Sequence, residues 1–524
     1  MSLPSINPTK TEAWKALEKH FQQIESLEMQ EIFIKDPSRA DNFKIEWQDF
    51  YFDFSKNRIT EETISLLIKL SEEVKLKEAI EKQFSGEKIN KTEDRAVLHS
   101  ALRDFENMKP EVKAILQKMQ DFSVEIINGN HRGFSGKAIT DIVNIGIGGS
   151  HLGPEMVTEA LKFYRNHLKI HFIANIDGDD VAEKLKIINP ETTLFIIVSK
   201  SFTTQETLEN ALYIRNWFLK SATEVDIQKH FVAVSVNENG AKDFGISNAN
   251  IFPMQDWVGG RFSLWSSVGL SICCAIGYKN FEALLKGAFE MDKHFKDTDL
   301  SKNIPVVLAL ISVWYNNFFK AESEAIVAYS QYLHKLVPYL QQAVMESNGK
   351  SVDRNGEKIE YQTGTIVWGN VGSNSQHAYF QLLHQGTKLI PTDFIGFSQS
   401  LHENGTNHNI LMANFFAQTE ALWEGTHNKN VDNAFKSFEG NKPTNTLLIK
   451  KLTPKNLGSL ISLYEHKLFV QGIIWNIFSY DQWGVELGKT VAKGTLKGIV
   501  EKNSNTIKNP STKNLLAQFF KECR

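Results

Sequence analysis

The hydrophobic pattern of this chain changes near residue 139, and this change restricts the fold more than any other feature. Short runs rich in β-branched residues, at 139–147, 168–176, 193–199 and 232–236, are separated by segments with helical spacing. Strands that alternate with helices form βαβ units, which build a parallel sheet covered by helices on both faces. The sequence therefore predicts an α/β fold.

A second series of strands is expected nearer the C-terminus, at residues 325–328, 364–368 and 388–394. Residues 368–373 repeat the strand, the Gly/Ser turn and the helix start that residues 145–150 show. Because 524 residues exceed what one hydrophobic core usually holds, the repetition indicates two related α/β domains.

Charge patterning predicts the remaining segments. Residues 10–110 place charged and apolar residues at helical spacing, and the charged stretch 286–302 predicts a helical linker or domain boundary. Residues 501–514 are rich in Asn, Ser, Thr and Lys, so we expect them to be exposed. They lead into a short amphipathic piece at 515–520 that could dock on a partner or on the body of the protein.

Composition argues against several classes of protein. The net charge of −3 and the pI near 6.6 are not those of a nucleic-acid binder. The first residues lack a secretory signal pattern, and the longest apolar run, 304–315, is too short to span a membrane. Cys273, Cys274 and Cys523 show no zinc-ligand spacing. We therefore expect a soluble cytoplasmic protein with reduced thiols, with no zinc site and no nucleic-acid or membrane partner.

Residues 144–154 predict a strand that runs through a glycine-rich turn into a helix. Glycines let the backbone approach an anion closely, and the helix N-terminus offers free N–H groups. A dinucleotide site with Asp177 as its ribose-binding acid is a competing interpretation, but the third glycine of that fingerprint is absent. A tight turn without any ligand is the other alternative.

A cluster of hydroxyl side chains with one lysine follows the predicted strand, at residues 199–207. Open α/β sheets bind their ligands at this carboxyl end of the strands. Helix capping would explain one or two of the hydroxyls but not four. We predict a site for a small monophosphate, because no nucleoside-triphosphate fingerprint is present.

Two further segments supply a cation and a carboxylate. Arg261 follows two glycines, and a guanidinium on a tight turn can stabilise oxyanion charge on a small substrate. An ion pair with a structural carboxylate is the alternative. Residues 341–350 predict a helix that ends in an Asn-Gly turn, with Glu346 in its last turn, where a carboxylate can face a cleft.

Two more predicted helices carry polar residues. His377 is expected in the first turn of a helix over 372–386, although a lone histidine is more often a core residue. Gln482, Glu486 and Lys489 have the spacing of one helical face. The plain interpretation is a row of solvent-exposed salt bridges along this face. The apolar run just before these residues instead favours a largely buried helix whose polar face lines a site.

These segments resemble the glucose-6-phosphate isomerase family. Four positions differ from the usual family pattern: His151 stands where Asp is frequent, Ser201 where Thr is common, and Ala343-Val344 where Gly-Asp is frequent. None of these differences removes a catalytic group. The agreement runs in order from about residue 90 to 490 and is carried by motifs at residues 92–99, 258–263, 345–350, 372–377 and 478–489.

The resemblance implies reversible isomerisation of glucose 6-phosphate and fructose 6-phosphate, in glycolysis and gluconeogenesis, without metal or cofactor. Glu346 is implied to be the base that moves a proton between C1 and C2, and Arg261 to stabilise the enediolate. His377 and Lys489 are implied to handle ring opening. The residues implied to bind the substrate and its phosphate are Gly149, Ser150, Ser199, Lys200, Ser201, Thr204, Gln342 and Gln482.

The resemblance also implies an organisation. Two sugar-isomerase-type (SIS) α/β domains with parallel-rich sheets are expected at 111–285 and 286–500. A helical N-terminal segment (1–110) would pack on the second domain, and residues 501–524 would form a C-terminal arm. Members of the family are homodimers whose active sites lie at the subunit interface, with the residue matching His377 supplied by the neighbouring subunit.

Two other functions stay open from the residues alone. A non-catalytic sensor of sugar phosphates would need the phosphate site, but not Glu346, Arg261, His377 and Lys489 together. An NAD-dependent oxidoreductase would need a third glycine at position 151, where this chain has His151.

Overall fold

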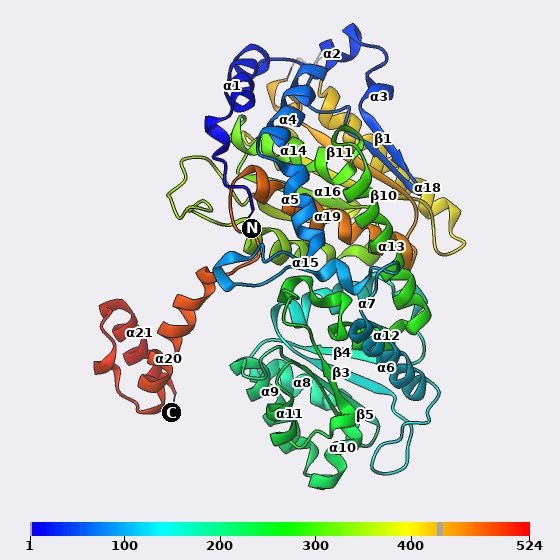
Figure 1. Cartoon of the computed structure of the whole chain (residues 1–524), viewed down its shortest axis with the longest axis vertical. Helices are drawn as coiled ribbons and strands as arrows, with labels where there is room; N and C mark the ends of the chain where they lie inside the picture. Colours follow the sequence, from blue (N-terminus) through cyan, green and yellow to red (C-terminus); the bar gives the residue numbers. More distant parts are fainter. Residues whose placement is uncertain (1–2, 427–432, 524) are drawn as a thin grey trace. The chain divides into compact units, whose positions relative to one another are not determined.

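The computed structural model describes residues 3–426 and 433–523, and the chain divides into two units, Met1–Ser479 and Tyr480–Arg524. The larger unit contains two sheets (Figure 1). The five-stranded sheet is parallel throughout and has the order β4-β3-β5-β6-β7. Its strands are β3 (Asp141–Ile145), β4 (Lys169–Ile173), β5 (Thr193–Val198), β6 (Phe231–Ser235) and β7 (Ile251–Pro253).

The six-stranded sheet has the order β1-β2-β11-β10-β8-β9. Its last four strands are parallel, and an antiparallel hairpin of β1 and β2 extends one edge by pairing with β11. Its strands are β1 (Lys44–Trp47), β2 (Phe50–Asp53), β8 (Ser323–Ala328), β9 (Ile366–Val371), β10 (Thr392–Gln399) and β11 (Thr444–Lys451).

The predicted α/β fold with parallel-rich sheets is confirmed. Each of the seven predicted strands is present, with β10 starting four residues later than expected. The helical prediction for residues 10–110 is wrong at 44–53, where the hairpin lies. Along β2 the buried residues Phe50 and Phe52 alternate with half-buried ones, and this period of two is that of a half-buried strand.

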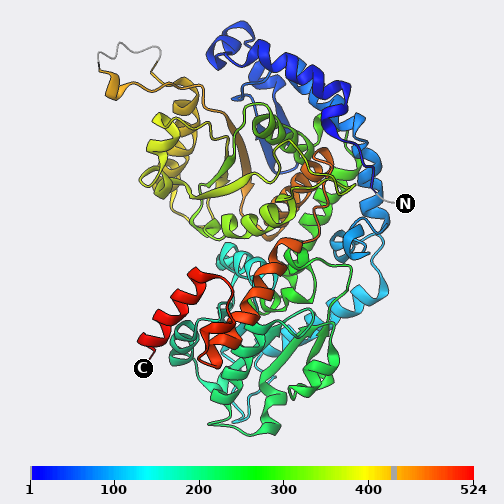
Figure 2. The same cartoon turned by 90° about the vertical axis from the view of Figure 1, so that its left-hand side faces the viewer.

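Helices enclose both sheets. α6 to α12 surround the five-stranded sheet, while the N-terminal helices lie beside the other sheet (blue in Figure 2). The helices before β3 are α1 (Glu12–Ile24), α2 (Met29–Lys35), α3 (Arg39–Asn42), α4 (Glu61–Glu73), α5 (Leu76–Ser85) and α6 (Pro110–Ile127). Those from β3 to β7 and just beyond are α7 (Leu152–Ala160), α8 (Gly178–Ile187), α9 (Gln205–Phe218), α10 (Ile227–His230), α11 (Glu238–Asp243) and α12 (Leu270–Ile276).

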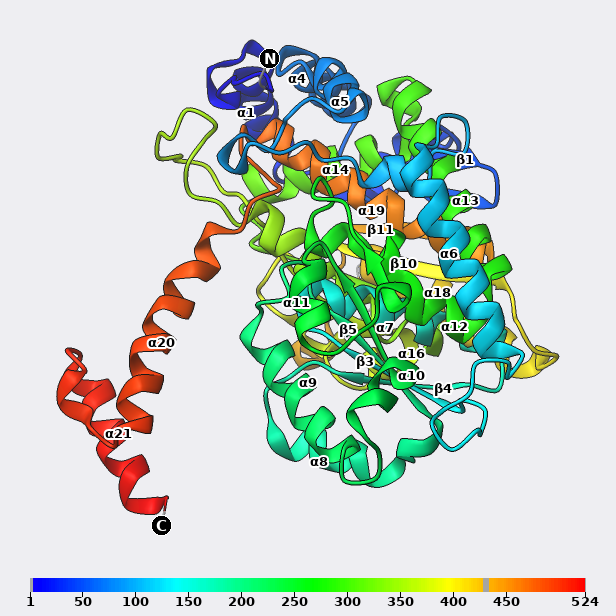
Figure 3. The same ribbon diagram turned by 60° about the horizontal axis from the view of Figure 1, so that its bottom comes forward.

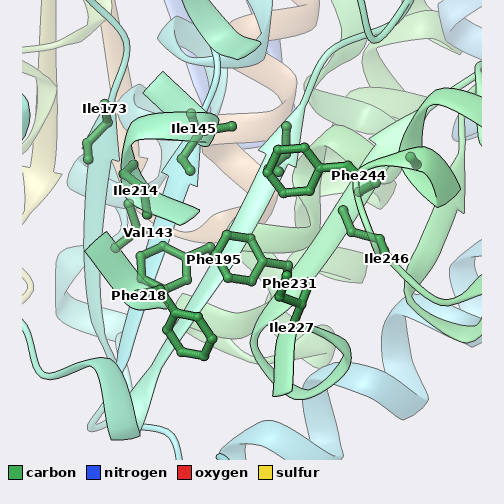
Figure 4. Close-up of a cluster of buried hydrophobic side chains, with 14 of the residues drawn as sticks. Val143, Ile145, Ile173, Phe195, Ile214, Phe218, Ile227, Phe231, Phe244 and Ile246 are labelled. Carbon is green, nitrogen blue, oxygen red and sulfur yellow. The ribbon is translucent and has the colours of Figure 1, made fainter. Parts of the chain in front are cut away.

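The core of the five-stranded sheet is rich in phenylalanine (Figure 4). Phe195 of β5 and Phe231 of β6 stack with their ring centroids 4.8 Å apart, and Phe218 of α9 meets the Phe231 ring edge-on. Every residue of β5 is buried, as expected for a central parallel strand covered on both faces. This rigid core sets the position of the loops that follow β3 and β5.

Two long helices join the halves of the larger unit. α13 (Tyr278–Asp297) packs along α19 (Pro454–Ile474), and α14 (Ile304–Asn317) lies against α19 as well (Figure 3). A Cβ on Gly458 would stand 1.9 Å from the carbonyl oxygen of Leu284, so the two backbones touch there. The part of the charged stretch 286–302 that lies in α13 is therefore helical, as predicted for a linker or domain boundary, and one face of this helix is buried.

The remaining helices of the larger unit follow β8 to β10. They are α15 (Leu336–Leu340), α16 (Gly372–Gln376), α17 (Phe380–Gln385) and α18 (Gly405–Glu424).

The smaller unit contains α20 (Glu486–Val500) and α21 (Pro510–Glu522). The expected burial of the helix that carries Lys489 is wrong for this chain, because α20 is exposed along almost its whole length, with Leu487 and Val500 each 74% exposed. Within the described part of the chain, no helix is both long and apolar enough to cross a membrane.

Candidate functional site

The candidate site begins where the strand order of the five-stranded sheet reverses. The chain passes from β3 to β4 on one side of β3 and then to β5 on the other side. Loops that leave neighbouring strands at such a point open a crevice at their carboxyl ends, which is the usual ligand position in open α/β sheets. The glycine turn (146–150) follows β3, and the hydroxyl loop (199–204) follows β5.

The glycine turn fits tightly against both neighbours. A Cβ on Gly146 would lie 2.9 Å from the carbonyl oxygen of Val198, just before the hydroxyl loop. A Cβ on Gly149 would lie 1.9 Å from the carbonyl oxygen of Gly260. Gly148 has φ +62°, a conformation that favours glycine. Ser150 is half-buried at the end of the turn, and its carbonyl oxygen accepts a hydrogen bond of 3.0 Å from Asn144.

The hydroxyl loop does not serve chiefly to cap a helix. Thr204 stands at the N-cap of α9 but makes no side-chain capping bond. Instead the buried Ser199 hydroxyl donates to Thr204 Oγ1 at 3.3 Å, and the hydroxyls of Ser201 and Thr203 lie 2.6 Å apart. Phe202 between them has φ 52°, the left-handed region that bulky residues rarely adopt. The loop is thus held in a strained conformation, a common feature of binding sites.

Lys200 ties this loop to the segment that precedes Arg261. Its Nζ donates to the carbonyl oxygens of Asp256 (2.7 Å) and Val258 (3.1 Å), and it lies 3.4 Å from Asp256 Oδ1. Burial lowers the pKa of Lys200, and the nearby Asp256 carboxylate opposes this effect. Arg95 also reaches Asp256 Oδ2, at 3.3 Å, which brings the motif at 92–99 to the same place.

Arg261 and Glu346 meet directly. Arg261 Nη1 lies 3.3 Å from Glu346 Oε2, while Nε donates to Ser347 Oγ at 2.8 Å and Nη2 donates to the carbonyl oxygen of Ser479 at 2.7 Å. The arginine side chain is 2% exposed and the glutamate side chain 23%. The ion pair considered as an alternative therefore exists, but its carboxylate is the other predicted site residue.

Glu346 lies at the end of a π-helical segment, Gln341–Glu346, that continues α15. The predicted helix is therefore present, with a wider turn, and such turns occur frequently at functional sites. Gln342 points toward the glycine turn, since its Nε2 lies 3.1 Å from where a Cβ on Gly148 would be. The Oε1 of Gln342 is buried and has no hydrogen-bond partner among the described residues.

His377 is not where the sequence placed it. The predicted helix over 372–386 is two short helices, α16 and α17, and His377 caps the C-terminal end of α16. The break lies at Tyr379, whose φ of −144° leaves the helical region. His377 is therefore exposed at a helix C-terminus and not in a first turn. His384 accepts or donates a 3.0 Å hydrogen bond to Gln418 and is structural, as expected.

Gln482 and Lys489 belong to the smaller unit. Gln482 precedes a 3₁₀ turn, Trp483–Val485, so it does not share a helical face with Lys489, and that prediction is wrong. Lys489 Nζ lies 2.8 Å from Glu486 Oε1, and both side chains are more than half exposed. In this chain the pair is thus the solvated salt bridge of the plain interpretation.

The other chemical candidates have structural roles. Asp177 caps α8, accepting a 3.0 Å hydrogen bond from the Asp179 N–H, as a helix N-cap does. Cys273 and Cys274 are buried free thiols, and burial raises the pKa of Cys274 to about 12. Within the residues that the structure describes, no group of three or more His, Cys, Asp or Glu side chains could hold a metal ion.

Sequence reasoning missed Ser347, Ser479 and Asp256 as individual residues. Ser347 and Ser479 lie inside recognised motifs, and Asp256 lies two residues before the motif at 258–263, but nothing in the local pattern distinguishes them from their neighbours. Their roles depend on partners far away along the chain, such as the 218 residues that separate Arg261 from Ser479.

Comparison with known proteins agrees with this geometry. Residues 53–516 match the family model of phosphoglucose isomerase. This chain belongs to that family. It is 61% identical to a glucose-6-phosphate isomerase of Christiangramia forsetii over 541 aligned residues, which cover 98% of this chain and 99% of that protein.

Two solved structures are similar over most of the chain. A glucose-6-phosphate isomerase from Chlamydia trachomatis superposes with a TM-score of 0.86 at 30% identity, covering 98% of this chain and 99% of that one. A hypothetical protein from Thermus thermophilus shares the fold with a TM-score of 0.66 at 24% identity, covering 85% of this chain and 99% of that one.

Proposed function

We propose that this phosphoglucose isomerase family member is an aldose–ketose isomerase that interconverts glucose 6-phosphate and fructose 6-phosphate, in glycolysis and gluconeogenesis. The observation that carries the proposal is the 3.3 Å pair of Arg261 and Glu346 beside two loops suited to a phosphate. Its relatives in C. forsetii and C. trachomatis bear the name of this activity. A sensor would have no need of a carboxylate paired with a buried arginine at the ligand site.

The pair suits proton transfer through a cis-enediolate. In the open-chain aldose, the Glu346 carboxylate takes the proton from C2, the electron pair of the C2–H bond forms the C1=C2 bond, and negative charge develops on O1. Arg261 stabilises that charge. Glu346 then returns the proton to C1, where it bonds to the electron pair of the C1=C2 bond, while the O2 hydroxyl passes its proton to O1 and the remaining O2 electron pair forms the C2 carbonyl of fructose 6-phosphate. One carboxylate can perform both transfers.

The other predicted residues receive roles as part of this proposal. His377 and Lys489 would move protons to and from the ring oxygen and the anomeric hydroxyl. Gln342 and Gln482 would position the sugar. The phosphate would be held by Ser150, Ser199, Lys200, Ser201 and Thr204, with Gly149 shaping the turn. The helix N-terminus of α9 and the hydroxyl donors of the 199–204 loop support an anion at this place.

We also infer a cytoplasmic homodimer that shares its active sites, with His377 supplied by the neighbouring subunit. The exposure of His377 and of the apolar residues along α20 supports an additional partner surface. The domain organisation remains a proposal too: 1–110 as a helical N-terminal segment, 111–285 and 286–500 as two SIS-type domains, and 501–524 as an arm. The pairing of β2 with β11 supports the docking of the first segment on the second domain.

The test is conversion of fructose 6-phosphate to glucose 6-phosphate by the purified protein, coupled to glucose-6-phosphate dehydrogenase, with EDTA present. We expect turnover in EDTA, and a kcat that falls by roughly 10²- to 10⁴-fold in Glu346→Gln because the base is lost. Glu360→Gln, an exposed residue of the same type, is the control and should keep full activity. Sugar phosphate that binds to the wild-type protein without turnover would instead identify a sensor.

A further inference from the structure

The geometry of the Arg261–Glu346 pair depends on how the Arg261 guanidinium is oriented. A guanidinium is planar and its N–H groups form a rigid fork. Once Nε is held by Ser347 and Nη2 by the Ser479 carbonyl, the direction of Nη1 toward Glu346 is set. The orientation therefore depends on whatever fixes Ser479, which lies five residues beyond the end of α19.

Asn348 fixes Ser479. The Ser479 hydroxyl donates to Asn348 Oδ1 at 2.8 Å. Asn348 Nδ2 in turn donates to two acceptors on α19, the carbonyl oxygen of Leu468 at 3.0 Å and Oε1 of Gln471 at 3.4 Å. Asn348 is fully buried, so its amide has no water to exchange these bonds with. One side chain thus joins α19 to the residue that holds Arg261.

The α19 backbone packs closely against the hydrogen bond between Ser479 and Asn348. A Cβ on Gly472 of α19 would lie 1.9 Å from Ser479 Oγ and 3.3 Å from Asn348 Oδ1. The hydroxyl is therefore clamped between the α19 backbone and the asparagine. Gln471 is also held from behind, because its Nε2 donates to Ser312 of α14 at 2.9 Å. The anchor is built into the two interior helices and not into a mobile loop.

We propose that Asn348 is a positioning residue for the isomerisation, acting through Ser479 to orient the Arg261 guanidinium toward the developing enediolate. The inference rests on the proposed function. Glu346, Ser347 and Asn348 are consecutive in the sequence. One turn of chain therefore carries the proposed base, the Ser347 hydroxyl that binds Arg261 Nε, and the Asn348 side chain that binds Ser479. Loss of Asn348 frees the Ser479 carbonyl, and the guanidinium then loses its alignment with the charge that forms only in the transition state.

The experiment measures kcat and KM for fructose 6-phosphate in Asn348→Ala. We expect kcat to fall by about 10- to 100-fold with KM within about twofold, because misalignment affects the transition state more than binding. Asn57→Ala is the matched control. Asn57 is also fully buried, and its Nδ2 bonds the carbonyl oxygens of Phe54 (3.0 Å) and Thr444 (3.1 Å) near the β2–β11 edge. It should lower Tm while kcat stays within about twofold of wild type.

A double mutant separates positioning from general destabilisation. If Asn348 acts through Arg261, the Asn348→Ala/Arg261→Ala variant is no slower than Arg261→Ala alone. Multiplied losses in the double mutant, or a kcat of Asn348→Ala within twofold of wild type, would overturn the proposal. In either case the wild-type protein still converts fructose 6-phosphate. Failure of the proposed function would instead appear as absence of turnover in the wild type.

A second variant keeps the test decisive if Asn348→Ala does not fold. Ser479→Ala removes only the hydroxyl that Asn348 holds and keeps the carbonyl that Arg261 uses. We expect kcat to fall by about 3- to 10-fold, again with no further loss in the Arg261→Ala background. Wild-type kcat in Ser479→Ala would contradict the proposed path.

Discussion

At Lys200, burial and a neighbouring charge shift the pKa of the side chain in opposite directions. Burial lowers its pKa, whereas the carboxylate of Asp256 raises it, and the net direction is downward. Lys200 therefore loses its proton at a lower pH than an exposed lysine, whose pKa is about 10.4. A phosphate dianion binds the protonated form, so we expect KM to be lowest at neutral pH and to rise as pH increases through the alkaline range.

The measurement is KM for fructose 6-phosphate from pH 7 to 10, in the wild type and in Lys200→Arg. Arginine keeps its charge throughout this range, so the alkaline rise in KM should disappear in the variant even if its KM at pH 7 is higher. Lys220→Arg, on the surface after α9, serves as the control and should retain the rise. An identical rise in both variants would assign the effect to another group.

Sequence reasoning reached those site residues whose surroundings are local. Arg261 was identified by the two glycines before it, and Lys200 by the hydroxyls around it. Their partners were not identified, because the Lys200–Asp256 contact spans 56 residues and the Arg261–Glu346 contact spans 85. His377 was assigned to the wrong end of a helix because the helix break at Tyr379 has no glycine or proline that would predict it from the sequence.

At the scale of elements, the glycine turn after β3 controls how closely two loops approach. A Cβ on Gly149 would stand 1.9 Å from the Gly260 carbonyl oxygen and 2.8 Å from the Arg261 nitrogen, so both backbones would have to separate. We expect Gly149→Ala to lower kcat/KM by about 100-fold or more, since displacements near 1 Å at a site have effects of that size.

Gly178→Ala provides the comparison for that substitution. Gly178 is the first residue of α8, and no heavy atom lies within 4 Å of the position its Cβ would take. Alanine favours the helix, so Tm should stay the same or rise slightly while kcat/KM is unchanged. Coupled-assay kinetics and thermal melting of both variants check this pair. Near-normal kcat/KM in Gly149→Ala would show that the two loops can separate without consequence.

Elements whose pattern reflects local burial were predictable, and elements that depend on distant partners were not. The strands of the parallel sheet appear as apolar runs because helices cover both faces, as at β5. The hairpin at 44–53 becomes part of a sheet only through β11, about 400 residues later. The apolar run at 469–478 does belong to the interior, but α20, farther along the chain, is exposed.

Of the residues proposed to act in catalysis, Arg261 and Glu346 are in contact within the larger unit of one chain. The unit brings Arg261, Glu346, Gln342 and both loops together through contacts within one chain. His377 instead lies exposed at the end of α16. If the active site is shared between two subunits, a site contains Glu346 of one chain and His377 of the other, and subunits with different defects can complement each other.

A heterodimer of Glu346→Gln and His377→Ala subunits tests this directly. Each variant should be impaired by roughly 10²-fold or more as a homodimer. In the heterodimer, one site combines both defects and the other combines wild-type Glu346 with wild-type His377, so the purified species should recover about half of the wild-type activity. The subunits would carry two different tags, so that only mixed dimers are assayed.

A heterodimer of Glu346→Gln with Arg261→Ala is the control: those residues contact each other within one chain at 3.3 Å, so each site keeps a defect and no activity returns. No recovery in the first pair would mean that His377 serves the site of its own chain, and an active monomer would exclude sharing altogether.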